Sequence, residues 1–92
     1  MNIKLIYDSL FFDVTRRHEE VVTVETATVD NLIELLSRRY GQAFKDTIID
    51  PYTHSPKPQV TILVNGHHQA WDAPIPDSAE VAFLVPIAGG FY

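Results

Sequence analysis

Two adjacent glycines near the end of the chain, Gly89-Gly90, are the residues that most directly suggest chemistry. Glycine has no Cβ and takes φ angles of either sign, so this pair can lie flat in a slot too narrow for other residues. Such geometry suits a carboxyl group that is presented to the active site of another protein. Phe91 and Tyr92 follow the pair, however, so we expect the terminal carboxylate to belong to Tyr92 and not to Gly90.

The segment before the glycines reads as a buried strand over residues 80–85, in which Val81, Phe83 and Val85 alternate with other residues. Pro86 has no backbone N–H and should end the strand. If Phe83 and Val85 point inward, Leu84 should point outward. With Pro86 and Ile87 it would then form an apolar, partner-binding patch beside the diglycine.

A helix is predicted over residues 29–40, between two sets of end signals. Thr28 is a good N-cap, Arg38-Arg39 place positive charge in the last turn, and Gly41 is suited to the position after the helix. The apolar residues recur at helical spacing and form one stripe: Val29, Leu32, Ile33, Leu36 and Tyr40. This stripe should pack against a sheet.

The remaining strands are expected at residues 2–8, 20–25, 60–64 and 67–70. Asn65-Gly66 favours a type I′ turn, which predicts that residues 67–70 return as a strand. Residues 42–59 are rich in proline and predict a long loop with a helical turn near residues 44–49. The pattern does not place Leu10 to Phe12.

This order of elements predicts an α+β fold in which the first and last strands lie side by side in a mixed sheet. We expect a ubiquitin-like β-grasp with four to five strands and one main helix across one face. Residues 1–88 should form the domain and residues 89–92 a flexible tail. No second domain is indicated, because 92 residues suffice for one core.

Composition narrows the functional classes. The chain has no cysteine, which excludes a cysteine nucleophile and a thiolate metal site and favours a reducing cytoplasm. The net charge of −5 argues against nucleic acid or an anionic membrane as the main partner and favours a partner with a basic surface. No signal peptide or membrane span is expected.

Other polar and aromatic residues have simpler interpretations. His18, His54, His67 and His68 are interpreted as surface or hairpin residues, so no metal site is predicted. Trp71 is expected at the edge of the core or at a partner contact. The acidic residues with no acid–base spacing are expected to form an acidic rim for docking: Asp50, Asp72, Asp77 and Glu80.

The sequence resembles the ubiquitin-like sulfur carriers, and within them the small subunit of molybdopterin synthase (MoaD-like) more than the thiamine-pathway carrier (ThiS-like). The resemblance rests on the capped helix, on Leu63-Val64-Asn65-Gly66, on the connection 72–77 and on the run from Glu80 to Gly90. It covers most of the chain. Phe91-Tyr92 depart from the family pattern of a terminal diglycine.

The resemblance implies a carrier that is not itself an enzyme and holds no cofactor. An E1-like enzyme would use ATP to adenylate Gly90, with Ala88 and Gly89 inserted in its slot, and the resulting thiocarboxylate would donate sulfur to an acceptor synthase subunit. The pathway would make a molybdopterin-type cofactor or an amino acid. A JAMM-type zinc peptidase would first remove Phe91 and Tyr92, because the Gly90 carbonyl is otherwise an amide.

Two alternatives share these sequence features. In the first, the Gly90 acyl group is transferred to lysine amines of target proteins, as in a ubiquitin-like modifier. In the second, the chain is a β-grasp interaction domain with an inert tail, and Phe91-Tyr92 pack on the sheet or on a neighbour.

Overall fold

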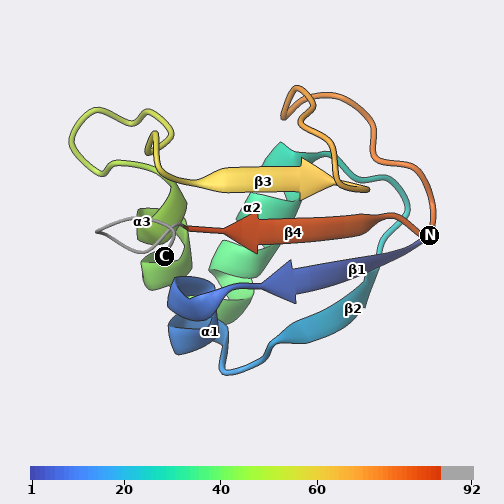
Figure 1. Cartoon of the computed structure of the whole chain (residues 1–92), viewed down its shortest axis with the longest axis horizontal. Helices are drawn as coiled ribbons and strands as arrows, with labels where there is room; N and C mark the ends of the chain where they lie inside the picture. Colours follow the sequence, from blue (N-terminus) through green and yellow to red (C-terminus); the bar gives the residue numbers. More distant parts are fainter. Residues whose placement is uncertain (86–92) are drawn as a thin grey trace.

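The computed structural model describes residues 1–85. Within this range the elements follow one another as β1 (Asn2–Tyr7), α1 (Ser9–Thr15), β2 (Glu19–Thr23), α2 (Val29–Tyr40), α3 (Gln42–Ile48), β3 (Thr61–Val64) and β4 (Glu80–Leu84). Figure 1 shows the strands lying across the molecule, with α2 behind them and α1 and α3 at their left end. No helix in residues 1–85 combines the length and apolar character that a bilayer span needs.

Within residues 1–85 the strands form one four-stranded mixed sheet in the order β2-β1-β4-β3. The first and last strands, β1 and β4, are parallel neighbours at its centre, with Leu5 opposite Val81. Both outer pairs, β1 with β2 and β3 with β4, are antiparallel. This topology, with helices on one face, confirms the predicted ubiquitin-like β-grasp.

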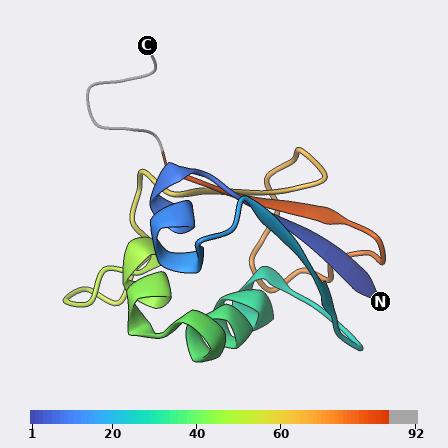
Figure 2. The ribbon, with the colours of Figure 1, turned by 90° about the horizontal axis from the view of Figure 1, so that it is seen from below.

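The helices of the described chain cover one face of the sheet and leave the other open (Figure 2). The predicted helix is confirmed with both of its caps: the Thr28 hydroxyl accepts the Asn31 N–H at 3.1 Å, and the Gly41 N–H donates to the Ser37 carbonyl. Gly41 has φ 92°, a region that glycine occupies at little cost. Four stripe residues of α2 are buried, namely Val29, Leu32, Ile33 and Leu36.

Two short helices occupy regions that the sequence pattern left open or assigned mostly to a loop. Helix α1 contains the unplaced residues 10–12, so β1 and β2 are joined through a helix and not by a tight hairpin. Helix α3 extends the predicted turn near residues 44–49 to the full range 42–48. Each helix places one fully buried ring in the core, Phe11 from α1 and Phe44 from α3.

The predicted strand at residues 67–70 is wrong. Asn65 (φ 52°) and Gly66 (φ 80°) do make the expected tight turn, but the return ends after a single bridge between Val64 and His67. The chain then bends away, because the Ala73 N–H donates to the Ala70 carbonyl. The edge of β3 opposite β4 therefore has no partner strand among the described residues.

A cluster of aromatic rings joins the short helices to the two central strands. The Phe83 ring of β4 lies 5.5 Å from the Phe11 ring, 5.7 Å from Phe44 and 5.8 Å from Tyr7, measured between centroids. Distances of this size are typical of favourable aromatic pairs. The cluster fixes the end of β4 from which the tail continues.

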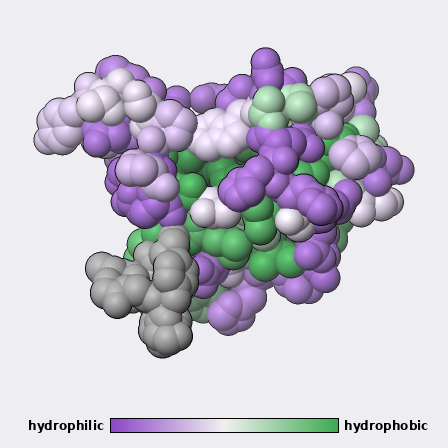
Figure 3. Space-filling model, turned by 45° about the horizontal axis from the view of Figure 1, so that its top comes forward, coloured by the Kyte–Doolittle hydropathy of each residue, from purple (hydrophilic) through white to green (hydrophobic). Residues whose placement is uncertain are grey.

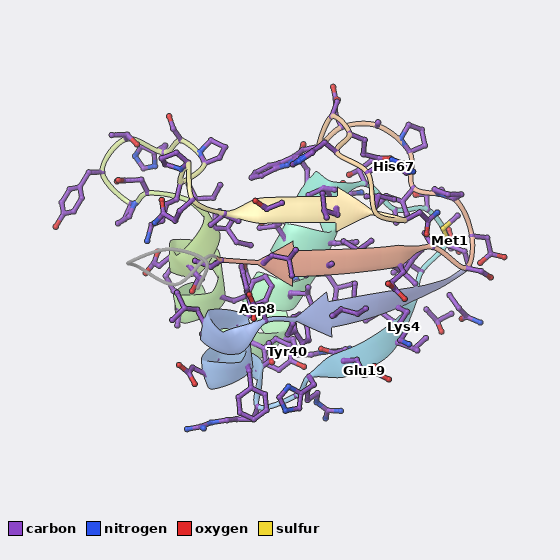
Figure 4. All side chains as sticks on the ribbon, viewed as in Figure 1. Met1, Lys4, Asp8, Glu19, Tyr40 and His67 are labelled. Atoms are coloured by element: carbon purple, nitrogen blue, oxygen red, sulfur yellow. The ribbon has the colours of Figure 1, made fainter. Side chains whose placement is uncertain are left out.

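Glu20 forms hydrogen bonds with two tyrosines that pack against this cluster. Its Oε2 atom accepts the Tyr7 hydroxyl at 2.6 Å and the hydroxyl of Tyr40, a residue labelled in Figure 4, and its Oε1 atom accepts Arg39 Nη1 at 2.7 Å. Only 6% of the Glu20 side chain is exposed. A buried carboxylate needs such partners, so these contacts tie β1, β2 and the end of α2 together.

Replacing the Phe83 ring should test the importance of the aromatic cluster. We expect Phe83→Ala to lower the free energy of unfolding by about 3–5 kcal/mol, because it leaves a cavity among rings that cannot close it. Val21→Ala is the control, since Val21 is 63% exposed, and should change the value by less than about 0.5 kcal/mol. Urea unfolding measures both, and equal effects would contradict the assigned role.

Glu20 should make stability depend on acid. Burial raises the pKa of Glu20, but hydrogen bonds from Tyr40 and Tyr7 and the Arg39 charge outweigh burial and hold the pKa below its usual 4.5. The carboxylate therefore stabilises the folded state fully when the pH is above the pKa of the unfolded chain. This stabilisation is lost as the pH falls through the lower pKa of the folded state. Glu20→Gln should cost about 1–3 kcal/mol at neutral pH and flatten the acid decline.

Urea unfolding at successively lower pH measures this dependence. Exposed Glu25 supplies the matched control, and Glu25→Gln should keep the acid decline of the original protein. An unchanged slope in Glu20→Gln would show that another carboxyl carries the effect.

Candidate functional site

The residues predicted to react or to be removed lie beyond the described range. They are Ala88, Gly89, Gly90, Phe91 and Tyr92, and two of the predicted docking residues, Pro86 and Ile87, lie there with them. The roles given to these seven residues remain predictions. The described chain shows where the tail begins.

The tail begins at a firmly held point, next to the centre of the sheet. Phe83 is fully buried and Val85 is 3% exposed, which confirms that both point toward the helices. The Asp8 N–H donates to the Phe83 carbonyl at 3.1 Å, so the end of β1 holds the end of β4. Any group carried by the tail is therefore presented from a fixed position on the domain.

The open face of the sheet carries an apolar surface that leads to this point. We call it the outer patch and define it as Ile6, Leu63, Ala82 and Leu84. Ala82 pairs with Ile6 on one side and with Leu63 on the other, and Leu84 is two residues further along the same face of β4. All four are partly exposed. Figure 3 shows apolar surface in the middle of this side, with polar residues around it.

The outer patch contains Leu84, whose docking role remains a prediction, and adds three residues that were not predicted. Leu84 faces outward as expected, although it is only partly exposed. Ile6, Leu63 and Ala82 were missed, because they meet only through the pairing of β4 with β1 on one side and with β3 on the other. The available signal was the unbroken apolar run in the first strand, where Ile6 follows Leu5 and would be polar in a strand with one solvated face.

Charges beside the patch are exposed and weakly coupled. Lys4 Nζ lies 3.6 Å from Glu19 Oε2, and both side chains are well exposed (Figure 4). An exposed pair of this kind contributes little to stability, about 0–1 kcal/mol. It is available to a partner because breaking it costs little.

The histidines and Trp71 have the positions that the sequence predicted. His18, His54, His67 and His68 are all exposed. Trp71 is half-buried and packs at the edge of the core. Within residues 1–85 no three side chains of the types that bind metals are grouped closely enough to hold an ion.

The four residues of the predicted acidic rim do not lie together, because Asp50 is separated from Asp72, Asp77 and Glu80. Asp50 lies in the connection that leads into β3, whereas Asp72 and Asp77 lie in the connection that leaves it, at the other end of that strand (Figure 1). Asp50 and Asp77 have local roles. Asp50 accepts the Tyr52 and Thr53 N–H groups, which lower its pKa, and Asp77 accepts the Asn2 N–H.

Comparison with solved structures gives matches over almost the whole chain. SAMP1 of Haloferax volcanii has a TM-score of 0.82 at 19% identity, with 98% of this chain and all of that one covered. A putative molybdopterin converting factor, subunit 1, of Pyrococcus furiosus has a TM-score of 0.74 at 27% identity. The match covers 94% of this chain and 98% of that one.

A third structure, the small archaeal modifier protein 1 of Methanosarcina acetivorans, has a TM-score of 0.76 at 21% identity. The match covers 97% of this chain and 96% of that one. The two modifier proteins, at this low identity, support the fold alone. No curated protein matches the sequence significantly.

The comparison with family models assigns the chain to a family. The model of the ThiS family matches residues 10–90, which is most of the sequence and ends at Gly90. This match supports a small carrier protein of the ubiquitin-like type. The chain belongs to the ThiS family and has the ubiquitin-like β-grasp fold.

Proposed function

We propose that this chain is a sulfur carrier that works through the carboxylate of Gly90 after Phe91 and Tyr92 have been removed. The observation that carries the proposal is the position of the diglycine. It follows the central strand β4 after a short segment, and the match to the ThiS family ends at Gly90. The two aromatic residues therefore lie outside the part that resembles the family.

The chemistry follows from the weak reactivity of a carboxylate. A Gly90 carboxylate oxygen attacks the α-phosphorus of ATP on an E1-like enzyme, which releases pyrophosphate and leaves an acyl-adenylate. A sulfide equivalent supplied by a partner then displaces AMP and leaves a thiocarboxylate. This sulfur passes to an acceptor synthase that makes a molybdopterin-type cofactor or an amino acid.

The carrier contributes position and docking, and the enzymes contribute catalysis. Gly89 and Ala88 add little bulk to the segment that must enter the activating site. The outer patch gives an activating enzyme or a synthase an apolar surface beside the start of the tail. The side chains of the carrier therefore act in binding, and the chain serves as a cosubstrate.

A ubiquitin-like modifier is the second candidate, and the similarity in fold to the archaeal modifier proteins favours it. It uses the same adenylated Gly90, but a lysine amine of a target protein displaces AMP and an amide forms. The two candidates differ only in the product. A thiocarboxylate shifts the intact mass of the free carrier, whereas a modifier gives conjugates on a denaturing gel.

Removal of the extension should be required for adenylation. We expect a chain that ends at Gly90 to support pyrophosphate exchange with ATP on the E1-like enzyme of the same organism, and the 92-residue chain to support none. A chain that ends at Gly89 is the matched control and should also fail, because its carboxylate falls one residue short. Exchange by the 92-residue chain itself would contradict the proposal.

A JAMM-type zinc peptidase is the proposed processing enzyme. Intact mass spectrometry of the protein isolated from its own cells should show the loss of Phe91 and Tyr92. Full retention of both residues would exclude processing, and with it this route to a Gly90 carboxylate.

Leu84 should contribute to partner binding. Leu84→Asp places a charge in the outer patch, and we expect it to weaken binding to the E1-like enzyme at least about tenfold, or 1.4 kcal/mol. Val21→Asp is the control, because Val21 is an exposed residue on the edge strand β2. Calorimetric titration measures affinity, and urea unfolding checks that the variant is folded. Equal affinities of both variants would place the docking surface elsewhere.

A further inference from the structure

An open groove of about 450 Å³ lies between α1 and α3, at the point where β4 ends. Its apolar lining comes from Leu10 and Val14 of α1, Ala43 of α3 and Val85. Its polar lining comes from Asp13, Asp46, Thr47, Lys57 and Gln59. Val85 directly follows β4 and is buried on the same side as Phe83, so the groove is on the helix side of the sheet. The outer patch is on the opposite side.

The α1 wall of the groove combines Asp13 with two apolar side chains, Leu10 and Val14. Val14 is partly buried against the core. Leu10 and Val14 are four residues apart and lie on one face of the helix. Leu10 is 46% exposed, one of three large apolar side chains in residues 1–85 that are exposed to this degree. By contrast, the neighbouring Phe11 is fully buried. Leu10 is therefore the apolar side chain of this wall that is open to a further contact.

The tail of this chain is the occupant that the geometry favours, because it starts at the groove itself. Val85 lines the groove and is followed by residues 86–92. Phe91 is six residues beyond Val85, which allows a reach of up to about 20 Å. A tethered segment has an effective concentration of order mM, so even a weak contact is populated.

We propose that Phe91 and Tyr92 fold back into this groove and hold the diglycine against the domain. Glycine residues at 89 and 90 permit the reversal of direction, because they take either sign of φ. The aromatic rings would cover the exposed apolar surface of Leu10 and Val14. The Lys57 ammonium forms no ion pair with any side chain of residues 1–85 and can donate to the Tyr92 hydroxyl.

The consequence for activation rests on the function proposed above. A latched tail keeps Gly89-Gly90 out of an activating enzyme, so removal of Phe91-Tyr92 both frees the Gly90 carboxylate and releases the segment that carries it. This contact of Phe91 and Tyr92 with the groove, which we call the latch, is a property of the isolated chain and is tested without any partner. Failure of the latch would leave the carrier function standing, and failure of adenylation would leave the latch standing.

Nuclear magnetic resonance tests the contact directly. In the 92-residue chain we expect nuclear Overhauser effects between the ring protons of residues 91 and 92 and the methyl groups of Leu10 and Val14. These methyl resonances should shift when the chain is shortened to Gly90, because the ring currents are lost. Absence of the Overhauser effects, with identical methyl shifts in both chains, would overturn the proposal.

Carboxypeptidase A, which removes C-terminal aromatic residues, measures how much of the tail is bound. A tail bound for about nine-tenths of the time loses Tyr92 about tenfold more slowly than a free one, because only the released form enters the protease. Leu10→Ser should therefore raise the rate at least about threefold. Val21→Ser, on the edge strand β2 and away from the groove, is the control and should leave the rate unchanged.

Ala43→Arg provides a second variant that occupies the groove from the other wall. Ala43 is exposed, so this change should leave the fold intact and speed the removal of Tyr92 in the same way. Equal rates for the original chain and both groove variants would overturn the proposal. A rate that falls as protein concentration rises would also overturn it, because the groove would then hold a second copy.

Discussion

The parallel pairing of β1 with β4 is the constraint on which the rest of this structure depends. Leu5 and Val81 are opposite one another although almost the whole domain separates them along the chain. The sheet is therefore complete only when the last strand has entered between β1 and β3. Closure of so long a loop has to be offset by burial, and the ring of Phe83 supplies much of it through its contacts with Tyr7, Phe11 and Phe44. The tail is thus displayed from a fixed point only by a folded domain.

The same strand serves the core and the surface, because successive side chains of a strand point to opposite faces. Phe83 and Val85 enter the core, whereas Ala82 and Leu84 lie in the outer patch. Within this short segment, the inward side chains therefore stabilise the fold and the outward side chains are available for binding. The alternation also links the two through the backbone, since a shift in the register of β4 by one residue would exchange the buried and exposed sets.

Local signals predicted the parts of the fold that depend on neighbours in sequence. The helix from Val29 to Tyr40 was predicted with both ends because Thr28, Gly41 and the apolar stripe all agree. Helix α1 was missed because it is seven residues long and has no acidic residue in its first turn or basic residue in its last. The strand after Asn65-Gly66 was wrong because a favourable turn does not guarantee a continuing ladder. The outer patch depends on pairings between distant strands, which periodicity alone does not reveal.

The two surfaces beside the end of β4 suggest how one short tail can be both withheld and presented. The groove between α1 and α3 opens on the helix side at Val85, whereas the outer patch reaches the end of β4 on the open side at Leu84. The groove holds the tail in the proposed scheme, whereas the outer patch receives the activating enzyme. In the proposed scheme the aromatic extension favours the groove, and its loss removes that preference without any rearrangement of the domain. The peptidase then acts on an equilibrium between two positions of the tail, and the fold remains the same in both.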